Sequence, residues 1–222
     1  MDGGQGQKRA LLLIDLQNDF VEGGALAVPH GNEVISVANR LIPHFEVVIA
    51  TLDWHPPNHR SFASQNAGIG LFESFELNGL PQTAWPDHCI AETVGAKLVA
   101  AVDREGIDHY VQKGTDVLID SYSGFFDNGH RRSTGLANLL RQEQVTEVFI
   151  LGLATDYCVL FTALDAKREG FGTTVITDGC RGVEIQAGDS ERAWEKMRSA
   201  GIRLLESAEV ISGESSKESR RD

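Results

Sequence analysis

Short runs of apolar residues alternate along this chain with segments whose apolar residues recur at helical spacing. The apolar runs are residues 10–14, 47–51, 110–112, 147–151 and 173–177, with a weaker run at 202–205. Continuous apolar runs of this length are typical of strands that are covered on both faces. Because helical segments lie between them, the pattern predicts an α/β fold with a mostly parallel central sheet and helices on both faces.

Five segments show the helical pattern. Their apolar positions are Val34, Ile35, Ala38, Leu41 and Ile42; Val94, Leu98, Val99 and Val102; Leu136, Leu139 and Leu140; a stripe that follows Thr155 and stops at Gly170; and Ala193, Trp194, Met197 and Ala200. The last segment starts near Asp189 or Ser190 and stops at Gly201. Ser, Thr or Asp before the first turn and Gly after the last are the expected helix boundaries.

Two long stretches, residues 20–31 and 56–93, match neither pattern. Long loops in compact domains are usually functional or disordered. We find no repeat and no low-complexity linker, so residues 1–222 are interpreted as a single domain. Residues 213–222 are polar throughout, and we expect this tail to be frayed.

Composition narrows the range of functions. The 222 residues are 41% hydrophobic and 23% charged, which excludes disorder as the dominant state. The net charge of −12 has the wrong sign for holding nucleic acid or an anionic membrane by general attraction. An odd number of cysteines, three, indicates a reducing compartment, and no segment predicts a secretion signal or a membrane span, so we expect a cytoplasmic protein. Assembly as a homo-oligomer stays open.

Polar residues follow several predicted strands at the point where each strand ends. Asp15, Asp53 and Lys113 each follow one strand, and residues 152–158 follow another. The carboxyl ends of parallel strands meet at one edge of a sheet, which is where ligands bind in such folds. Asp after a strand is also a common turn former or helix cap, but four such features together favour a functional site.

Cys158 is the candidate nucleophile. It follows a strand and a glycine-containing turn, and the helix that begins there is expected to have Thr155 or Asp156 as its cap. The positive end of a helix favours thiolate over thiol, so we expect a lowered pKa for Cys158. The alternative is a buried, inert cysteine, with Lys113 as a surface charge. We assign that structural role to Cys89 and Cys180.

A metal site is predicted from Asp53 and His55, which lie two residues apart on an extended segment and so point to the same side. His88 can supply a third ligand from the end of the long loop, and His59 is a competing candidate. Two imidazoles and one carboxylate suit Zn, Fe or Mn better than Ca or Mg.

Seven motifs in order carry a family resemblance. ALLLIDLQNDFVEGG, ATLDWHPPNHRSFAS, WPDHC, VQKGTD, DSYSGFFDN, GLATDYCV and ITDGCRGV together resemble the nicotinamidases of the isochorismatase-like cysteine hydrolases, over residues 9–211. The resemblance implies a three-layer α/β/α fold. It also implies hydrolysis of nicotinamide to nicotinate and ammonia in NAD salvage.

The resemblance also implies a catalytic triad of Asp15, Lys113 and Cys158. In that role Cys158 attacks the amide, Asp15 transfers protons and Lys113 stabilises the anions beside it. The oxyanion hole maps to the backbone N–H groups of Ala154 and Cys158, with a cis peptide bond expected between Leu153 and Ala154.

By the same resemblance, one divalent metal ion is held by Asp53, His55 and His88, with Zn the favoured metal and His59 left open as a further ligand. One coordination position of the ion would be open to the pyridine nitrogen of the substrate. The aromatic substrate pocket maps to a separate set of side chains, which are Phe20, Trp85 and Tyr122.

Two other functions stay open on the sequence. A relative could act on another small amide or carbamoyl compound, or on isochorismate, although these reactions have no evident need for the metal ligands. A binding protein could keep the fold without catalysis, but it would gain nothing from Asp15, Lys113 and Cys158 together.

Overall fold

Six parallel strands form the central sheet. The computed structural model of the chain describes residues 8–218, and the side chains of residues 8–213. The strand order is β5-β2-β1-β6-β7-β8. The strands are β1 (Lys8–Ile14), β2 (Val47–Asp53), β5 (His109–Lys113), β6 (Val145–Leu153), β7 (Gly172–Arg181) and β8 (Arg203–Leu205). Each predicted apolar run lies in one of these strands, so the predicted sheet is confirmed.

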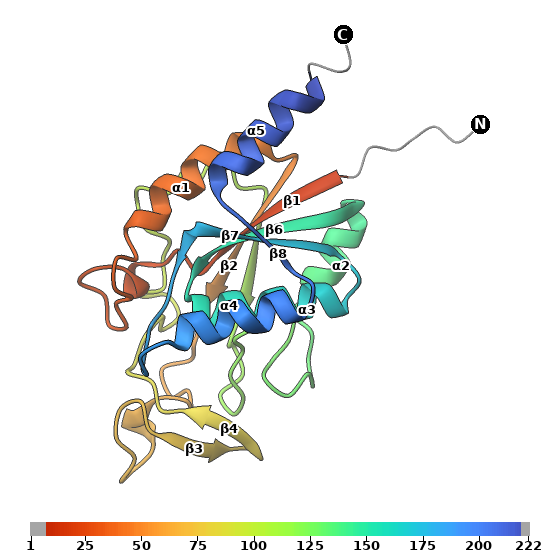
Figure 1. Ribbon diagram of the computed structural model, residues 1–222. Helices are drawn as coiled ribbons and strands as arrows, with labels where there is room; N and C mark the ends of the chain where they lie inside the picture. The colour runs from red at the N-terminus through yellow and green to blue at the C-terminus, as the bar shows by residue number, and fades with distance from the viewer. Residues whose placement is uncertain (1–7, 219–222) are drawn as a thin grey trace.

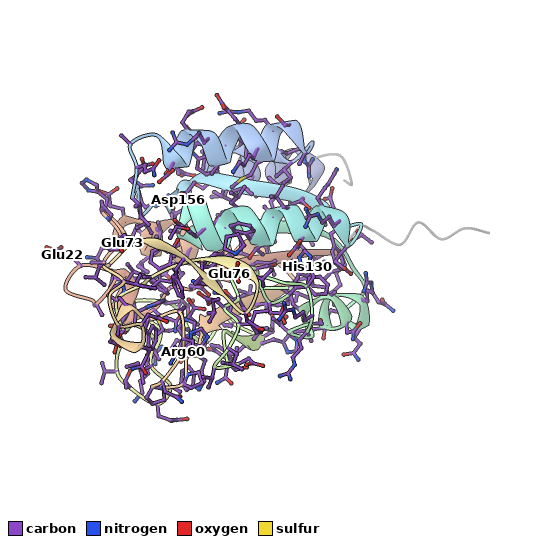
Figure 2. The ribbon with its side chains drawn as sticks, turned by 90° about the horizontal axis from the view of Figure 1, so that it is seen from below. Glu22, Arg60, Glu73, Glu76, His130 and Asp156 are labelled. Atoms are coloured by element: carbon purple, nitrogen blue, oxygen red, sulfur yellow. The ribbon has the colours of Figure 1, made fainter. Side chains whose placement is uncertain are left out.

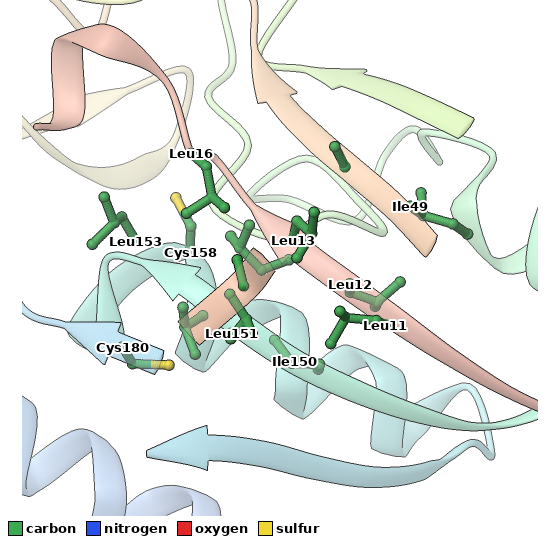
Figure 3. Packing of buried hydrophobic residues seen from close by; sticks show 14 of the residues in the cluster. Leu11, Leu12, Leu13, Leu16, Ile49, Ile150, Leu151, Leu153, Cys158 and Cys180 are labelled. Carbon is green, nitrogen blue, oxygen red and sulfur yellow. The ribbon is translucent and has the colours of Figure 1, made fainter. Parts of the chain in front are cut away.

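The core lies where β1 pairs with β2 on one side and with β6 on the other. The register places Leu12 beside Ile49 of β2 and Ile150 of β6. All three are buried, and Figure 3 shows them packed with neighbouring leucines. Both faces of β1 are therefore covered, which explains why its sequence is continuously apolar.

Helices cover both faces of the sheet. In Figure 1, α1 (Glu33–Leu41) and α5 (Ser207–Glu218) lie on one face, and α2 (Leu136–Gln142), α3 (Leu160–Arg168) and α4 (Asp189–Ser199) lie on the other. Short 3-10 turns occur at Asn18–Phe20, Ile42–His44 and Ala63–Gln65, and a single π-helical turn spans Thr155–Val159. None of the helices in residues 8–218 is long and apolar enough to cross a membrane.

The helix predicted from Val94 to Val102 is wrong. This segment forms turns, and Val94 is exposed. Its backbone bonds to the start of the chain instead: Asn18 N–H donates to the Lys97 carbonyl, and Val99 N–H donates to the Leu16 carbonyl. These long-range bonds use the peptide groups that a helix would need.

The tail that we expected to fray from Gly213 begins within a helix, and the fraying itself stays a prediction. The helix α5, which the sequence pattern did not predict, continues to Glu218, and residues 219–222 lie outside the described residues. At its start, Ser207 N–H and Oγ donate to the two carboxylate oxygens of Asp178, which fixes this end on β7.

The long stretch 56–93 contains an antiparallel hairpin of β3 (Ser74–Leu77) and β4 (Leu80–Thr83). Its two turn residues, Asn78 and Gly79, both have positive φ, the conformation that two-residue hairpins favour. Figure 1 shows this hairpin apart from the sheet, on the side where β1, β2 and β6 end.

Candidate active site

The polar residues predicted at strand ends meet at one edge of the sheet. Asp15 directly follows β1, while Asp53 and Lys113 are the last residues of β2 and β5. Asp53 and Lys113 are direct partners in the strand register. Cys158 follows β6 in the π-helical turn, so four neighbouring strands place these four side chains.

Lys113 lies at the centre of the group and is fully buried. Its Nζ lies 2.9 Å from Asp15 Oδ2 and 2.6 Å from Asp53 Oδ1. The same nitrogen donates to the Ser121 carbonyl at 2.9 Å and lies 3.4 Å from Cys158 Sγ. Burial disfavours the ammonium, but the two carboxylates outweigh it and raise the pKa of Lys113 well above its usual range.

Asp15 is buried beside the thiol. Thr51 Oγ1 donates to its Oδ1 at 2.6 Å, whereas Oδ2 receives the Lys113 ion pair but no hydrogen bond of good geometry. One oxygen of Asp15 and Cys158 Sγ lie within 4.8 Å of each other. Burial raises the pKa of Asp15, and Lys113 opposes that rise. A carboxyl group whose pKa is raised can both accept and return a proton.

The turn that carries Cys158 differs from the prediction. Neither Thr155 nor Asp156 caps the helix, because the cap is Ala154 and no side chain bonds to it. Single π-helical turns are frequent at functional sites. The Asp156 carboxylate instead accepts from backbone N–H groups of the loop that follows β7.

The lowered pKa that we predicted for Cys158 is also wrong. Burial raises the pKa of the thiol well above its usual value, and Asp15 and Asp53 add to the rise, although Lys113 opposes it. The charge of the lysine is largely compensated by the two carboxylates it contacts. The direction of this shift favours the thiol over the thiolate in the metal-free protein.

The expected cis peptide bond is present between Leu153 and Ala154. Just before it, Gly152 has a φ of 133°, and a Cβ at this position would overlap the Ile14 carbonyl of the neighbouring strand. The backbone of residues 152–154 thus passes close to β1 before it turns towards Cys158. Ala154 and Cys158 both line the same pocket.

Asp53, His55 and His88 form a buried group that can hold a metal ion. One ligand atom from each lies within 4.8 Å of the others, with Asp53 Oδ2 3.6 Å from His55 Nε2 and 3.9 Å from His88 Nε2. The Nδ1 atoms face carbonyls, of Gly114 at 2.9 Å and of Pro86 at 2.7 Å, which leaves the Nε2 atoms for the ion. His55 Nε2 is buried without a hydrogen-bond partner. This set fits a divalent metal of the zinc type.

The charges of these ligands are strongly coupled. Burial disfavours charge on Asp53, but Lys113 and His55 outweigh it and hold the pKa of Asp53 well below its usual range. Burial and the neighbouring His55 lower the pKa of His88 to about 4. Burial also opposes charge on His55, yet Asp53 outweighs it and raises the pKa of His55.

His59, which we left open as a further ligand, lies beside this group. Its ring centre is 4.5 Å from that of His55, and its buried Nε2 has no hydrogen-bond partner. Together with His55 and Asp120 it forms a second set of potential ligands. His59 Nδ1 faces the Ser61 hydroxyl at 2.7 Å.

The three predicted aromatic residues line one pocket with Cys158. Phe20, Trp85 and Tyr122 surround about 330 Å³ of free space, open solvent at the mouth included. The other lining residues are Leu26, Asp53, His88, Asp120, Ala154, Tyr157 and Val183. Two of the three predicted metal ligands, Asp53 and His88, thus line the same cavity as the nucleophile, whereas His55 does not.

Several residues of the site were not predicted. Gln17 bonds to both backbone groups of Asp53, and Thr51 bonds to Asp15. Tyr157 packs its ring against Trp85 at 4.8 Å, and Val183 comes from the loop after β7. Both residues belong to motifs of the family resemblance, Tyr157 to GLATDYCV and Val183 to ITDGCRGV, but the motifs alone do not show that these side chains line the pocket.

Comparison with known proteins decides the family. Residues 9–209 match the isochorismatase domain. The chain belongs to the isochorismatase family. It is 53% identical over 200 residues to a nicotinamidase of Escherichia coli (strain K12), covering 88% of this chain and 93% of that one.

Solved members of the isochorismatase family share its fold. A nicotinamidase/pyrazinamidase of Acinetobacter baumanii superposes with a TM-score of 0.89 at 40% identity, covering 93% of this chain and 99% of that one. PnC1 of L. infantum, in complex with nicotinate, gives 0.80 at 32% identity (91% and 94% covered). The pyrazinamidase of Pyrococcus horikoshii, in complex with zinc, gives 0.74 at 35% identity (90% and 99% covered). The predicted fold class and family are confirmed.

Proposed function

We propose that this protein hydrolyses nicotinamide to nicotinate and ammonia, with Cys158 as the nucleophile. The observation that carries the proposal is the buried group in which Lys113 contacts Asp15, Asp53 and Cys158, of which Asp53 and Cys158 line an aromatic pocket. Similarity to the E. coli nicotinamidase and to PnC1 in complex with nicotinate supports nicotinamide as the substrate. The product nicotinate would enter NAD salvage.

Acylation begins when Sγ of Cys158 attacks the amide carbon and its proton passes to Asp15, whose Oδ2 has no other hydrogen bond of good geometry. The carbonyl oxygen becomes an oxyanion, which the backbone N–H groups of Ala154 and Cys158 would receive. The C–N bond then breaks, and Asp15 returns the proton to the leaving nitrogen, which departs as ammonia. The product of this step is a thioester on Cys158.

Deacylation uses the same groups in reverse roles. Asp15 takes a proton from water, the hydroxide attacks the thioester carbon, and the C–S bond breaks with the electron pair on sulfur. The thiolate regains its proton from Asp15, the carboxyl group of the product gives its proton to solvent, and nicotinate leaves. Lys113 is protonated at rest because both carboxylates raise its pKa, and Asp53 remains beside it while Asp15 carries the proton, so the ammonium stabilises the anionic sulfur and the anionic carboxylate.

Asp53, His55 and His88 are proposed to hold one divalent metal ion, with zinc favoured over iron or manganese. The zinc complex of the P. horikoshii pyrazinamidase supports this choice. When bound, the ion would supply a Lewis acid for the ring nitrogen of the substrate. The rings of Phe20, Trp85 and Tyr122 would contact the pyridine, and His59 stays open as a further ligand.

All three cysteines are free and buried. Their state supports the proposal that the protein works in the reducing cytoplasm.

The test is an assay of the purified protein with nicotinamide, an N-carbamoyl amino acid and isochorismate as separate substrates. We expect ammonia and nicotinate in equal amounts from nicotinamide. We also expect Cys158→Ala to lose at least about 10³-fold in kcat, whereas the matched control Cys180→Ala, another buried cysteine, should stay active. Turnover of either other substrate in preference to nicotinamide would overturn the assignment.

A further inference from the structure

Asp156 carries a buried carboxylate that the proposed mechanism does not use. It lies two residues before Cys158 on the π-helical turn and is 8% exposed. Its Oδ1 accepts from Val183 N–H at 3.0 Å, and its Oδ2 accepts from Glu184 N–H at 2.8 Å. Figure 2 shows Asp156 where α3 begins, with α4 beside it. Both oxygens therefore connect the nucleophile turn to the loop after β7.

This loop, residues 182–184, contributes to the substrate pocket. Val183 lines the cavity together with Cys158, and Glu184 has a φ of 57°. Glu184 in turn accepts from the N–H groups of Gly188 and Ser190, at 2.9 and 2.8 Å, where α4 begins. A Cβ on Gly182 would overlap the Ser190 hydroxyl. Among residues 8–213, Asp156 supplies the side-chain hydrogen bonds that join the nucleophile turn to this loop.

The bonding pattern requires a carboxylate. Two adjacent backbone N–H groups need two acceptor atoms, and an ionised carboxylate offers acceptors only. An asparagine of the same shape would keep one acceptor but direct an NH₂ group at the second N–H, which would leave a buried donor without a partner. We expect the loop to shift away from the pocket in such a variant.

We propose that Asp156 is a positioning residue that holds Val183 against the pocket, and that Val183 limits which ring-substituted amides can react with Cys158. The inference rests on the proposed amidase function. It adds Val183 as a side chain that determines specificity and the Asp156 carboxylate as the group that fixes its position. Neither side chain takes part in the proposed chemical steps on the amide.

The experiment compares kcat and KM for nicotinamide with those for nicotinamides methylated at ring position 5 or 6. Rejection of one methyl group by an apolar pocket is worth roughly 10- to 200-fold in kcat/KM. We expect Asp156→Asn and Val183→Ala each to reduce the discrimination against the more strongly rejected analogue by at least fivefold. Asp156→Asn should also lower kcat/KM for nicotinamide by about 10- to 100-fold, because substrate is held less well in register with the thiol.

The matched control is Asp178→Asn. Asp178 also accepts a backbone N–H through its carboxylate, from Ser207 at 2.8 Å, but it is not among the lining residues of the pocket. This variant should keep wild-type discrimination between the analogues. Thermal unfolding of every variant shows whether it is folded. If Asp156→Asn is not folded, Val183→Ala still decides whether Val183 limits which ring-substituted amides react.

A second readout follows the loop itself. In hydrogen exchange, the amides of Val183 and Glu184 should exchange at least tenfold faster in Asp156→Asn than in wild type, with the Asp178→Asn protein unchanged. The double variant Asp156→Asn/Val183→Ala should discriminate no worse than Asp156→Asn alone, since both changes remove the same contact.

Three results would overturn the inference: a wild type that accepts both methylated analogues as well as nicotinamide, an equal loss on all substrates in Asp156→Asn, or additive effects in the double variant. A wild type without activity on nicotinamide would instead contradict the proposed function. The two failures are therefore distinguishable.

Discussion

At the scale of single residues, the site depends on charge compensation around Lys113. The ammonium lies within 3 Å of carboxylate oxygens from Asp15 and Asp53 and 3.4 Å from Cys158 Sγ. Burying a lysine beside a single carboxylate would cost desolvation free energy. With two carboxylate partners, the side chains of Lys113, Asp15 and Asp53 together carry one negative charge. In the metal-free protein, burial and this excess negative charge raise the pKa of the Cys158 thiol, and Asp15 is the neighbouring group that the proposed mechanism uses as a base.

The reactivity of Cys158 towards iodoacetamide should report this protonation state. Because burial and the carboxylates raise the pKa of the thiol, the thiolate fraction should increase about tenfold per pH unit between pH 7 and 9. The alkylation rate of Cys158, followed by mass spectrometry, should increase in proportion. A rate that reaches its plateau below pH 7 would contradict the account and restore the lowered pKa predicted from the sequence.

Lys113→Met should remove activity and destabilise the fold. The substitution leaves Asp15 and Asp53 buried without a cation, which typically costs about 3–5 kcal/mol in the free energy of unfolding. Urea unfolding measures this loss. The control Arg141→Met breaks an exposed ion pair with Glu169 and should change stability by less than about 1 kcal/mol. Equal losses in the free energy of unfolding would show that Lys113, Asp15 and Asp53 do not stabilise the fold as one charge-compensated group.

At the scale of elements, the sequence was most informative where burial is two-sided. Strands β1, β2 and β6 could be predicted because both of their faces are covered, which requires continuous apolar runs. The residues after these strands could be predicted as site residues because parallel strands end at one edge. Residues 94–102 could not, since their apolar spacing fits a helix while the distant segment 16–19 supplies their hydrogen bonds.

Gly95 tests this account of the 94–102 segment. A Cβ at Gly95 would overlap the Asp19 carboxylate, which accepts from Cys89 N–H at 2.7 Å beside the proposed metal ligand His88. We expect Gly95→Ala to destabilise the protein by about 1–3 kcal/mol and to raise KM for nicotinamide. Gly213→Ala is the control, because a Cβ there has no atom within 4 Å. An unchanged KM and melting temperature in Gly95→Ala would contradict the close approach.

At the scale of the whole molecule, the net charge of −12 affects encounters with other molecules, whereas the proposed metal ligands affect the stability of the fold. The charge disfavours general attraction to polyanions, and an uncharged amide needs no electrostatic steering. Fold and family could be read from the ordered motifs. The π-helical turn, the Asp156 bonds and Val183 could not, because they depend on which loops pack together.

Zinc should stabilise the whole fold in a pH-dependent way. Ligand binding to the folded state raises the melting temperature, and histidine ligands must lose their protons first. Since Asp53 outweighs burial and raises the pKa of His55, the ion must displace a proton at low pH, so the shift after adding zinc to chelator-treated protein should be larger at pH 8 than at pH 6.

The increase in melting temperature after zinc is added should vanish in His88→Ala and persist in His109→Ala. His109 is a half-exposed histidine that pairs with Glu143. A shift of equal size in both variants would place the ion elsewhere.

The most direct test of the central claim is the mass of the protein during turnover. Acid quenching of wild-type protein with nicotinamide should reveal a population heavier by one nicotinoyl group, located on the peptide that contains Cys158. Cys158→Ala should show neither the adduct nor nicotinate formation. Nicotinate production by Cys158→Ala at a wild-type rate would contradict the covalent mechanism.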